Sequence, residues 1–324
     1  MTTTARVAQP SPHILAALAQ AGATPGKTAL QHAEALVELA VDLQTQPKTA
    51  QDLVDAIFLY ARAEELAAAG LVALARALAG RGVALRRMPG YTMDALVEAR
   101  GCLDQALTVL RAGGGDEEVA ELEMNLGLVL HTLAGAELAP LKDAVGAYQA
   151  ALRFFTAERF PREYATLHNN LATAYLAMRL APEREGLREA LAVQSFQEAL
   201  KVVTLDDDPV EYAMLQNNLG NALQAIASAH RFENLERAIV AYDEALRVRT
   251  RHAMPLEHAN TLVNKANALM NLPDGPDATD NPIHLRAAIA LLETAEAIYR
   301  EHGVLDRAHI AAECRRGLAQ ELAT

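Results

Sequence analysis

The chain has 324 residues, with 41 acidic (Asp and Glu) and 29 basic (Lys and Arg) side chains and a formal net charge of −12. Hydrophobic residues make up 51% of the chain, yet aromatic residues contribute only 4% and Trp is absent. Most of the apolar mass is therefore Ala and Leu, which favour helices and disfavour an all-β sandwich. The acidic balance argues against a nucleic acid partner, because phosphates require clustered Lys and Arg.

Cysteine content and hydropathy indicate the compartment. Cys102 and Cys314 lie far apart in the chain and do not make a disulfide framework, which fits a reducing environment. No apolar run reaches the ~18 residues of a membrane span. We therefore expect a cytoplasmic protein that does not cross a membrane.

The first 28 residues are expected to form a flexible N-terminal segment, followed by a helical repeat domain at 29–324. Within the first segment, the Ala-rich run Ile14–Gln20 has the composition of a helix. The run Ala21–Thr28 matches the phosphate-binding P-loop pattern through Gly26, Lys27 and Thr28. A P-loop needs a strand before it, and the sequence shows no strand pattern, so we interpret this match as coincidental.

Helices in the repeat domain recur in pairs. The second helix of each pair carries Ala, a large residue four positions later and Ala three positions after that, and the large residue is aromatic in four pairs and Leu in two. These triplets are Ala56/Tyr60/Ala63, Ala99/Leu103/Ala106, Ala144/Tyr148/Ala151, Ala192/Phe196/Ala199, Ala238/Tyr242/Ala245 and Ala288/Leu292/Ala295. The pattern predicts six second helices.

The first helix of each pair carries two small residues seven positions apart. These are Ala33/Ala40, Ala77/Ala84, Ala120/Gly127, Ala165/Ala172, Ala213/Gly220 and Ala259/Ala266. The distance from the last Ala of one pair to the second small residue of the next pair is 21 residues in all five cases, as from Ala63 to Ala84. This constancy predicts a fixed turn between pairs and a variable turn within them.

Small residues seven apart lie on one face of a helix, two turns apart, and allow a neighbouring helix to approach closely. One pair cannot bury its apolar face alone, so successive pairs are expected to stack. Pro161, Pro209 and Pro255 mark helix starts. The last segment, Asp306–Leu322, aligns with a first helix but carries charged residues, as a terminal helix with a solvated outer face would.

These features resemble the tetratricopeptide repeat (TPR) family, whose helices carry the same small and large packing positions. The run Asn217–Leu223 reads Asn-Asn-Leu-Gly-Asn-Ala-Leu and is similar to a bacterial type of repeat, and His168–Tyr175 is similar to kinesin-light-chain repeats. The period of about 43–49 residues exceeds the usual ~34. The resemblance implies an all-α, right-handed superhelix of about six TPR-like antiparallel helix pairs plus a C-terminal capping helix.

A row of asparagines on the first helices is the main candidate site. Two positions before the aligned small residue, four successive pairs carry Asn125, Asn170, Asn218 and Asn264, and nearby positions add Asn169, Asn217, Asn221, Asn260 and Asn267. We call this set the asparagine ladder. The resemblance implies that these residues face a concave groove, where amides can bond a peptide backbone. The alternative is that they bond adjacent helices and fix the repeat geometry.

Charged and metal-ligating residues give weaker candidates. Arg81, from the basic set Arg76, Arg81, Arg86 and Arg87, aligns with Asn169 and Asn217 and could pair with an acidic partner segment or lie on a solvated face. The central repeats lack Lys and Arg at the ladder positions, so a carboxylate-terminated tail is not the expected ligand. The histidines show no metalloprotease spacing, and the loop residues Asp274, Asp277 and Asp280 lack calcium-loop spacing.

These observations predict a non-catalytic protein–protein interaction scaffold or adaptor, or an assembly factor, that binds a partner segment in its concave groove. No cofactor, metal, nucleic acid or membrane partner is expected. The alternative is a structural, self-associating repeat protein that forms homo-oligomers. A P-loop nucleotide-binding protein is the third hypothesis.

Overall fold

The computed structural model describes residues 9–21, 28–67, 70–179, 185–226, 230–272 and 282–323. All regular secondary structure in these ranges is helical, which confirms the predicted all-α class. The chain divides into two compact units, Met1–Thr156 and Ala157–Thr324, here called the N-terminal unit and the C-terminal unit. Each unit is built from helical pairs.

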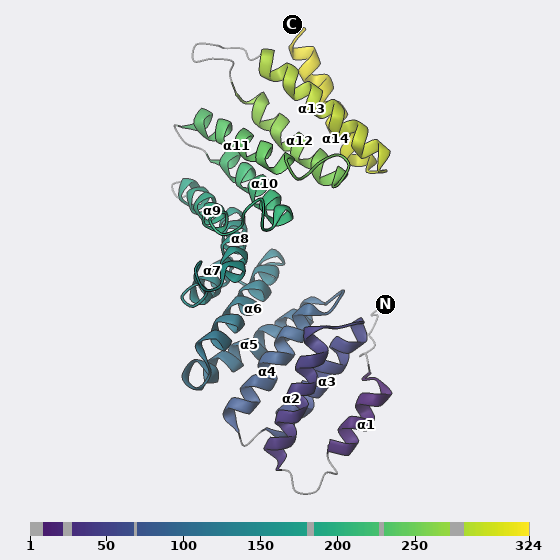
Figure 1. Cartoon of the computed structure of the whole chain (residues 1–324), viewed down its shortest axis with the longest axis vertical. Helices are drawn as coiled ribbons and strands as arrows, with labels where there is room; N and C mark the ends of the chain where they lie inside the picture. Colours follow the sequence, from purple (N-terminus) through teal and green to yellow (C-terminus); the bar gives the residue numbers. More distant parts are fainter. Residues whose placement is uncertain are drawn as a thin grey trace. The chain divides into compact units, whose positions relative to one another are not determined.

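The N-terminal unit holds one short helix followed by three helical pairs (Figure 1). Its helices are α1 (Pro12–Ala21), α2 (Ala29–Thr45), α3 (Ala50–Leu66), α4 (Leu71–Arg87), α5 (Met93–Gly113), α6 (Asp116–Gly135) and α7 (Leu141–Ala151). Helix α2 packs on α3, α4 on α5 and α6 on α7. Each pair thus joins one predicted first helix to one predicted second helix.

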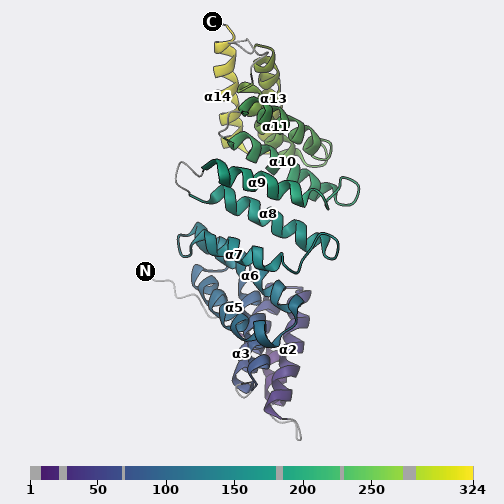
Figure 2. The ribbon, with the colours of Figure 1, turned by 90° about the vertical axis from the view of Figure 1, so that its left-hand side faces the viewer.

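The C-terminal unit holds three further pairs and a terminal helix. Its helices are α8 (Pro161–Ala177), α9 (Glu185–Ala199), α10 (Pro209–Ala225), α11 (Arg231–Leu246), α12 (Pro255–Met270), α13 (Pro282–Glu301) and α14 (Leu305–Glu321). Figure 2 shows α8 and α9 lying side by side as one such pair. The terminal α14 packs on α13, and Glu313 and Arg316 on it are exposed, as predicted for a capping helix.

The predicted packing residues form the core of both units. Among the large residues of the second helices, Tyr60, Tyr148, Phe196 and Tyr242 are at most 1% exposed, and the flanking alanines are fully buried. A Cβ atom added to Gly127 would lie 2.5 Å from the ring of Tyr148, and one added to Gly220 would lie 2.6 Å from the ring of Tyr242. The small residues are therefore required because the aromatic rings of the second helices occupy the adjacent space.

Proline and aspartate define several helix starts. Pro161, Pro209 and Pro255 each occupy the first helical position, where a missing N–H is not needed. The side chain of Asp208 accepts a hydrogen bond from the backbone N–H of Glu211 at 3.0 Å and caps α10. These local signals place the helix starts at the residues that the sequence predicted.

The connection between pairs keeps its length but not its conformation. Helix α5 continues to Gly113, beyond the packing residue Ala106, whereas α7 ends at its packing residue Ala151 and is followed by turns. The prediction of one fixed turn was therefore wrong in conformation. The constant spacing reflects the register of buried positions, which a longer helix or a series of turns can maintain equally well.

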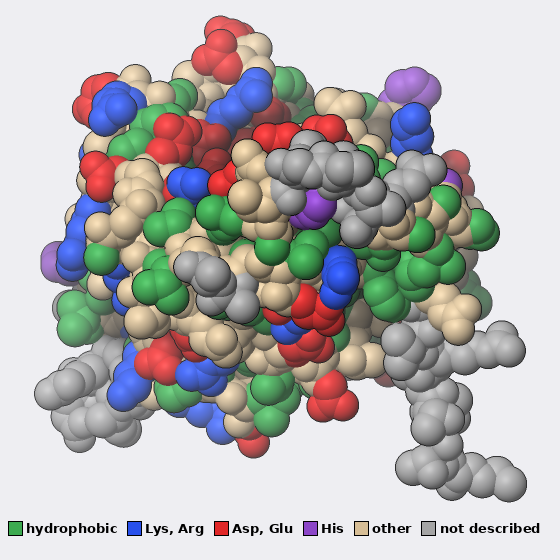
Figure 3. Space-filling view, turned by 90° about the horizontal axis from the view of Figure 1, so that it is seen from below, with side chains coloured by type: hydrophobic (Ala, Val, Ile, Leu, Met, Phe, Trp, Pro, Cys, Tyr) green, Lys and Arg blue, Asp and Glu red, His purple; other side chains and the backbone are tan. Residues whose placement is uncertain are grey.

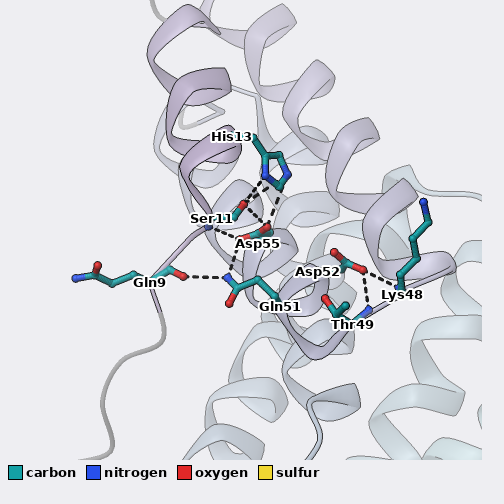
Figure 4. Close-up of polar contacts among 8 residues, drawn as sticks. All are labelled: Gln9, Ser11, His13, Lys48, Thr49, Gln51, Asp52 and Asp55. Atoms are coloured by element: carbon teal, nitrogen blue, oxygen red, sulfur yellow. Dashed lines mark hydrogen bonds and ion pairs between the residues drawn. The ribbon is translucent and has the colours of Figure 1, made fainter.

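Helix α1 is attached to the N-terminal unit by a buried carboxylate (Figure 4). Asp55 on α3 is fully buried and accepts hydrogen bonds from the Ser11 backbone N–H at 2.8 Å and the Ser11 hydroxyl at 2.6 Å. The Gln51 amide adds a third bond at 3.0 Å, and Ile14 is 2% exposed. The segment 1–28 was expected to be flexible, but Pro12–Ala21 within it form a docked helix, in keeping with the helical composition of Ile14–Gln20.

Several candidates from the sequence fall outside the described residues. These include Gly26 and Lys27 of the P-loop match and the loop residues Asp274, Asp277 and Asp280. Thr28, which completes the P-loop match, is the capping residue of α2 and accepts a hydrogen bond from the Gln31 N–H at 3.2 Å. Its hydroxyl therefore has a local structural role at the start of the helix.

The surface chemistry is mixed. On the face drawn in Figure 3, acidic and basic side chains are interspersed with apolar ones. Over the described part of the chain, no helix has the length and apolar character needed to cross a bilayer. The same part of the chain contains no group of three or more His, Cys, Asp or Glu placed to hold a metal ion.

Candidate functional site

A hollow of about 480 Å³ lies in the C-terminal unit and is lined in part by three members of the asparagine ladder. We call it the C-terminal hollow. Its lining comes from α10, α12, α13, α14 and the connection before α12, and consists of Asn217, Arg249, Glu257, Asn260, Val263, Asn264, Tyr299, Arg307, Ile310 and Ala311. The first helices α10 and α12 thus both contribute side chains to this hollow.

Asn217 joins two first helices from inside the hollow wall. It is 7% exposed, and its Oδ1 accepts hydrogen bonds from the Thr261 hydroxyl at 3.1 Å and from the Asn264 amide at 3.2 Å. The fully buried Thr261 also contacts the carbonyl oxygen of Glu257 at 2.9 Å. Because the Asn217 carbonyl is used twice between α10 and α12, this residue fixes the spacing of the two helices.

Asn260 connects the last three helices. Its Oδ1 accepts a hydrogen bond from the Tyr299 hydroxyl at 2.7 Å and another from the Arg307 guanidinium at 2.6 Å. These bonds link α12 to α13 and α14. Burial raises the pKa of Tyr299, so its hydroxyl stays protonated and remains a donor.

Arg249 reaches the hollow from the connection between α11 and α12, and sequence reasoning did not predict it. The residue is 9% exposed. Its Nη1 donates to the Thr261 hydroxyl at 3.1 Å, while its Nε is enclosed without a hydrogen-bond partner. Burial lowers the pKa of the Arg249 guanidinium, because desolvation penalises the charged form, and Glu257 opposes this effect.

A signal for Arg249 was present in the repeat register. The residue lies four positions after the last packing Ala of its second helix. In the other five pairs this position holds a buried apolar or aromatic residue, namely Ala67, Leu110, Phe155, Val203 and Tyr299. A cation at a position that is elsewhere apolar is a departure that an alignment of the pairs could have found.

The remaining ladder residues lie outside this hollow. Asn125 in the N-terminal unit accepts a hydrogen bond from Arg86 at 3.0 Å, and Asn221 accepts one from the Tyr242 hydroxyl at 2.8 Å. The Oδ1 of Asn169 is enclosed without a partner. Asn170 on α8 and Asn218 on α10 are half-buried, and Asn267 on α12 is exposed.

Two of the four arginines in the predicted basic set of the N-terminal unit pair with carboxylates, whereas Arg86 and Arg87 donate to neutral oxygens of Asn125 and Gln44. Arg81 contacts the carboxylates of Glu64 at 3.0 Å and Glu98 at 3.3 Å, and Arg76 contacts Glu118 at 2.8 Å. Arg81 also borders a second hollow of about 680 Å³, which is lined mainly by apolar side chains. Its charge is therefore balanced within the unit and is less available to an acidic partner.

Comparison with solved structures finds helical repeat proteins at low sequence identity. No protein-family model matches the chain, and no curated protein matches it. The TPR2AB-domain:pHSP90-complex of yeast Sti1 matches with a TM-score of 0.31 and 18% identity, over 89% of this chain and 98% of that one. A signal transduction ATPase with a tetratricopeptide repeat sensor from Pyrococcus horikoshii matches with a TM-score of 0.46 and 13% identity, over 87% of this chain but only 41% of that one.

The class of the protein follows from its own packing. Paired helices, buried alanines at the repeated positions and glycines beneath the second-helix tyrosines are the features of a TPR-like helical repeat protein.

Proposed function

We propose that the chain is a non-catalytic protein–protein interaction scaffold that binds a segment of a partner protein at the first helices of the C-terminal unit. The observation that carries this proposal is the convergence of Asn217, Asn260 and Asn264 on one hollow. Adaptor and assembly-factor roles in the cytoplasm both fit such a scaffold. We extend the proposal to the rest of the asparagine ladder apart from Asn267, which is exposed and lies outside the hollow, and to Arg81 as a further groove residue.

All three asparagines have hydrogen-bonding capacity left within the described residues, including the Nδ2 of Asn217, and Asn260 and Asn264 are the two that are less buried. Within the described residues, the Nδ2 of Asn260 and the Oδ1 of Asn264 have no hydrogen bond, whereas the other atom of each amide is engaged. One donor and one acceptor are what a single peptide group of a ligand requires. Because backbone groups are the same in every sequence, such recognition places little demand on the side chains of the partner.

A structural role for part of the ladder has its own support. Asn217 is buried and its carbonyl is fully used between α10 and α12. We therefore assign Asn217 to the stability of the repeat and Asn260 and Asn264 to recognition. Self-association of the chain is the alternative function, in which these amides would bond a second copy.

Affinity purification from the native host tests the proposal. The tagged wild-type chain, the Asn264→Ala variant and the Asn267→Ala variant are compared, since Asn267 lies on the same helix but is exposed and outside the hollow. Partners identified by mass spectrometry are then purified and titrated. We expect Asn264→Ala to fold and to bind at least about tenfold more weakly, with Asn267→Ala unchanged. Equal binding by both variants would remove the hollow from the interface.

A further inference from the structure

Arg249 is a buried cation that forms no ion pair among the described residues, although the charge of Glu257 favours it from a greater distance. Over the described residues, no Asp or Glu oxygen lies within the 4.0 Å of an ion pair with its guanidinium. Its side chain donates one hydrogen bond, to the neutral hydroxyl of Thr261, and its Nε has no partner. Buried guanidinium groups are normally paired with an anion, because desolvating an unpaired charge is costly.

The repeat fold does not require a cation at this position. The equivalent residue in every other pair is buried and apolar or aromatic, so the same packing is achieved without charge. A residue that departs from the repeat pattern and makes the fold less stable is expected at functional positions rather than at structural ones. The missing partner of Arg249 is therefore best supplied by a ligand.

The C-terminal hollow has the size and the side chains to receive that ligand. Its volume of about 480 Å³ falls in the range of small-molecule sites. A second cation, Arg307 on α14, lines the same hollow, and its guanidinium is bonded only to the neutral oxygen of Asn260 among the described residues. Glu257 is the acidic member of the lining and leaves the two arginines in excess.

We propose that the C-terminal hollow is an oxyanion-binding site, in which Arg249 and Arg307 bind a carboxylate or phosphate group of a ligand. Guanidinium groups bind both kinds of group through charge-assisted hydrogen bonds. The Nδ2 of Asn260 is a further donor at the same site. The proposal does not depend on a protein partner, because the site is defined by its two cations and can be tested with free anions.

Isothermal titration calorimetry at constant ionic strength tests the site, with inorganic phosphate in one arm and succinate in the other. Three proteins are compared: wild type, Arg249→Met and Arg251→Met. Arg251 is the matched control, because it lies two residues away but is exposed and paired with Glu301 at 3.0 Å. We expect saturable binding of at least one anion to wild type, a loss of at least about tenfold in Arg249→Met, and a change under about twofold in Arg251→Met.

The two arms separate the sources of the oxyanion. Binding of phosphate alone supports a phosphate ligand, and binding of succinate alone supports a carboxylate ligand. No saturable heat in either arm, or equal losses in Arg249→Met and Arg251→Met, would overturn the proposal. The exposed Arg307→Gln variant provides a second test that does not disturb the buried wall, and unchanged anion binding by this variant would remove Arg307 from the site.

Discussion

The half-buried Arg81 of the N-terminal unit contacts two carboxylates, whereas the buried Arg249 of the C-terminal unit contacts none among the described residues. Both side chains border a hollow, so their difference lies in what neighbouring helices provide. In the N-terminal unit the folded chain itself neutralises the cation. In the C-terminal unit the guanidinium of Arg249 bonds only the neutral hydroxyl of Thr261 among the described residues, and Glu257 acts on it from beyond ion-pair distance.

The largest expected effect tests whether both units need a small residue on the first helix beneath the aromatic ring of the second helix, which we call the packing rule. Gly127→Ala and Gly220→Ala place a methyl group against Tyr148 and Tyr242, and we expect each to lower the free energy of unfolding by about 2–3 kcal/mol. Urea unfolding followed by circular dichroism measures the change. Gly146→Ala is the control, because a Cβ there meets open space on α7, and it should stabilise the helix by about 0.5–1 kcal/mol. Equal effects at all three glycines would contradict the packing rule.

Arg81→Met tests the balanced cation of the N-terminal unit. The substitution leaves Glu64, with a side chain only 16% exposed, without its nearest cation. Burial already raises the pKa of Glu64 despite Arg81. We expect a loss of about 2 kcal/mol in urea unfolding, below the range for fully buried pairs. If Arg81→Met is as stable as wild type, the Arg81–Glu64 contact does not stabilise the unit.

The repeated tyrosine–glutamate contacts test a smaller difference within the C-terminal unit. The Tyr164 hydroxyl donates to Glu198 at 2.8 Å and the Tyr212 hydroxyl to Glu244 at 2.9 Å, each joining the two helices of a pair. We expect Tyr164→Phe and Tyr212→Phe each to cost about 1 kcal/mol of unfolding free energy. In the next pair the equivalent residue, His258, instead contacts the backbone carbonyl oxygen of Arg249 at 2.6 Å. Equal costs at Tyr164 and Tyr212 would show that these contacts repeat energetically as well as geometrically, and no cost at either would show that they do not.

Each unit also contains a histidine whose burial disfavours protonation. Burial lowers the pKa of His131 in the N-terminal unit and of His168 in the C-terminal unit. The unfolded chain therefore binds protons more readily than the folded one, and stability is lost as the pH falls below the unfolded value of about 6.5.

The melting temperature of wild type is expected to fall between about pH 7.5 and pH 5.5, and we expect a smaller fall in His168→Gln. The difference corresponds to about 1 kcal/mol or less of unfolding free energy. The exposed His309, which pairs with Glu313 at 3.2 Å, is the control position. A decline of the same steepness in wild type and His168→Gln would exclude His168 as its source.

The architecture was predictable because it depends on residue size at fixed intervals. The alanines and glycines of the repeat pattern specify which helix faces can approach, and proline and aspartate specify where helices start. The register also placed the asparagines on the first helices, and the structure brings Asn217, Asn260 and Asn264 to one hollow. The conformation of the connections did not follow, because α5 and α7 maintain one spacing with different lengths of helix.

The hydrogen-bond partners of the site were not predictable from the register. Whether Asn217 bonds Thr261 or a ligand depends on side-chain directions in a neighbouring pair. The same holds for charge, since Arg81 is neutralised by residues on α3 and α5 rather than on its own helix. Arg249 lies in a connection, outside the aligned helices. Its importance is indicated only by the buried apolar or aromatic residues at the equivalent positions of the other pairs.

The unfolding free energy of Arg249→Met, measured in urea without added phosphate or dicarboxylate, tests the central claim most directly. The variant loses one hydrogen bond to Thr261 but removes an unpaired buried charge, and methionine suits a position that is apolar in the other pairs. We predict a gain of about 1 kcal/mol over wild type, as expected of a residue retained for binding at the expense of stability. A loss of about 1 kcal/mol or more would show that Arg249 serves the fold and would contradict this account.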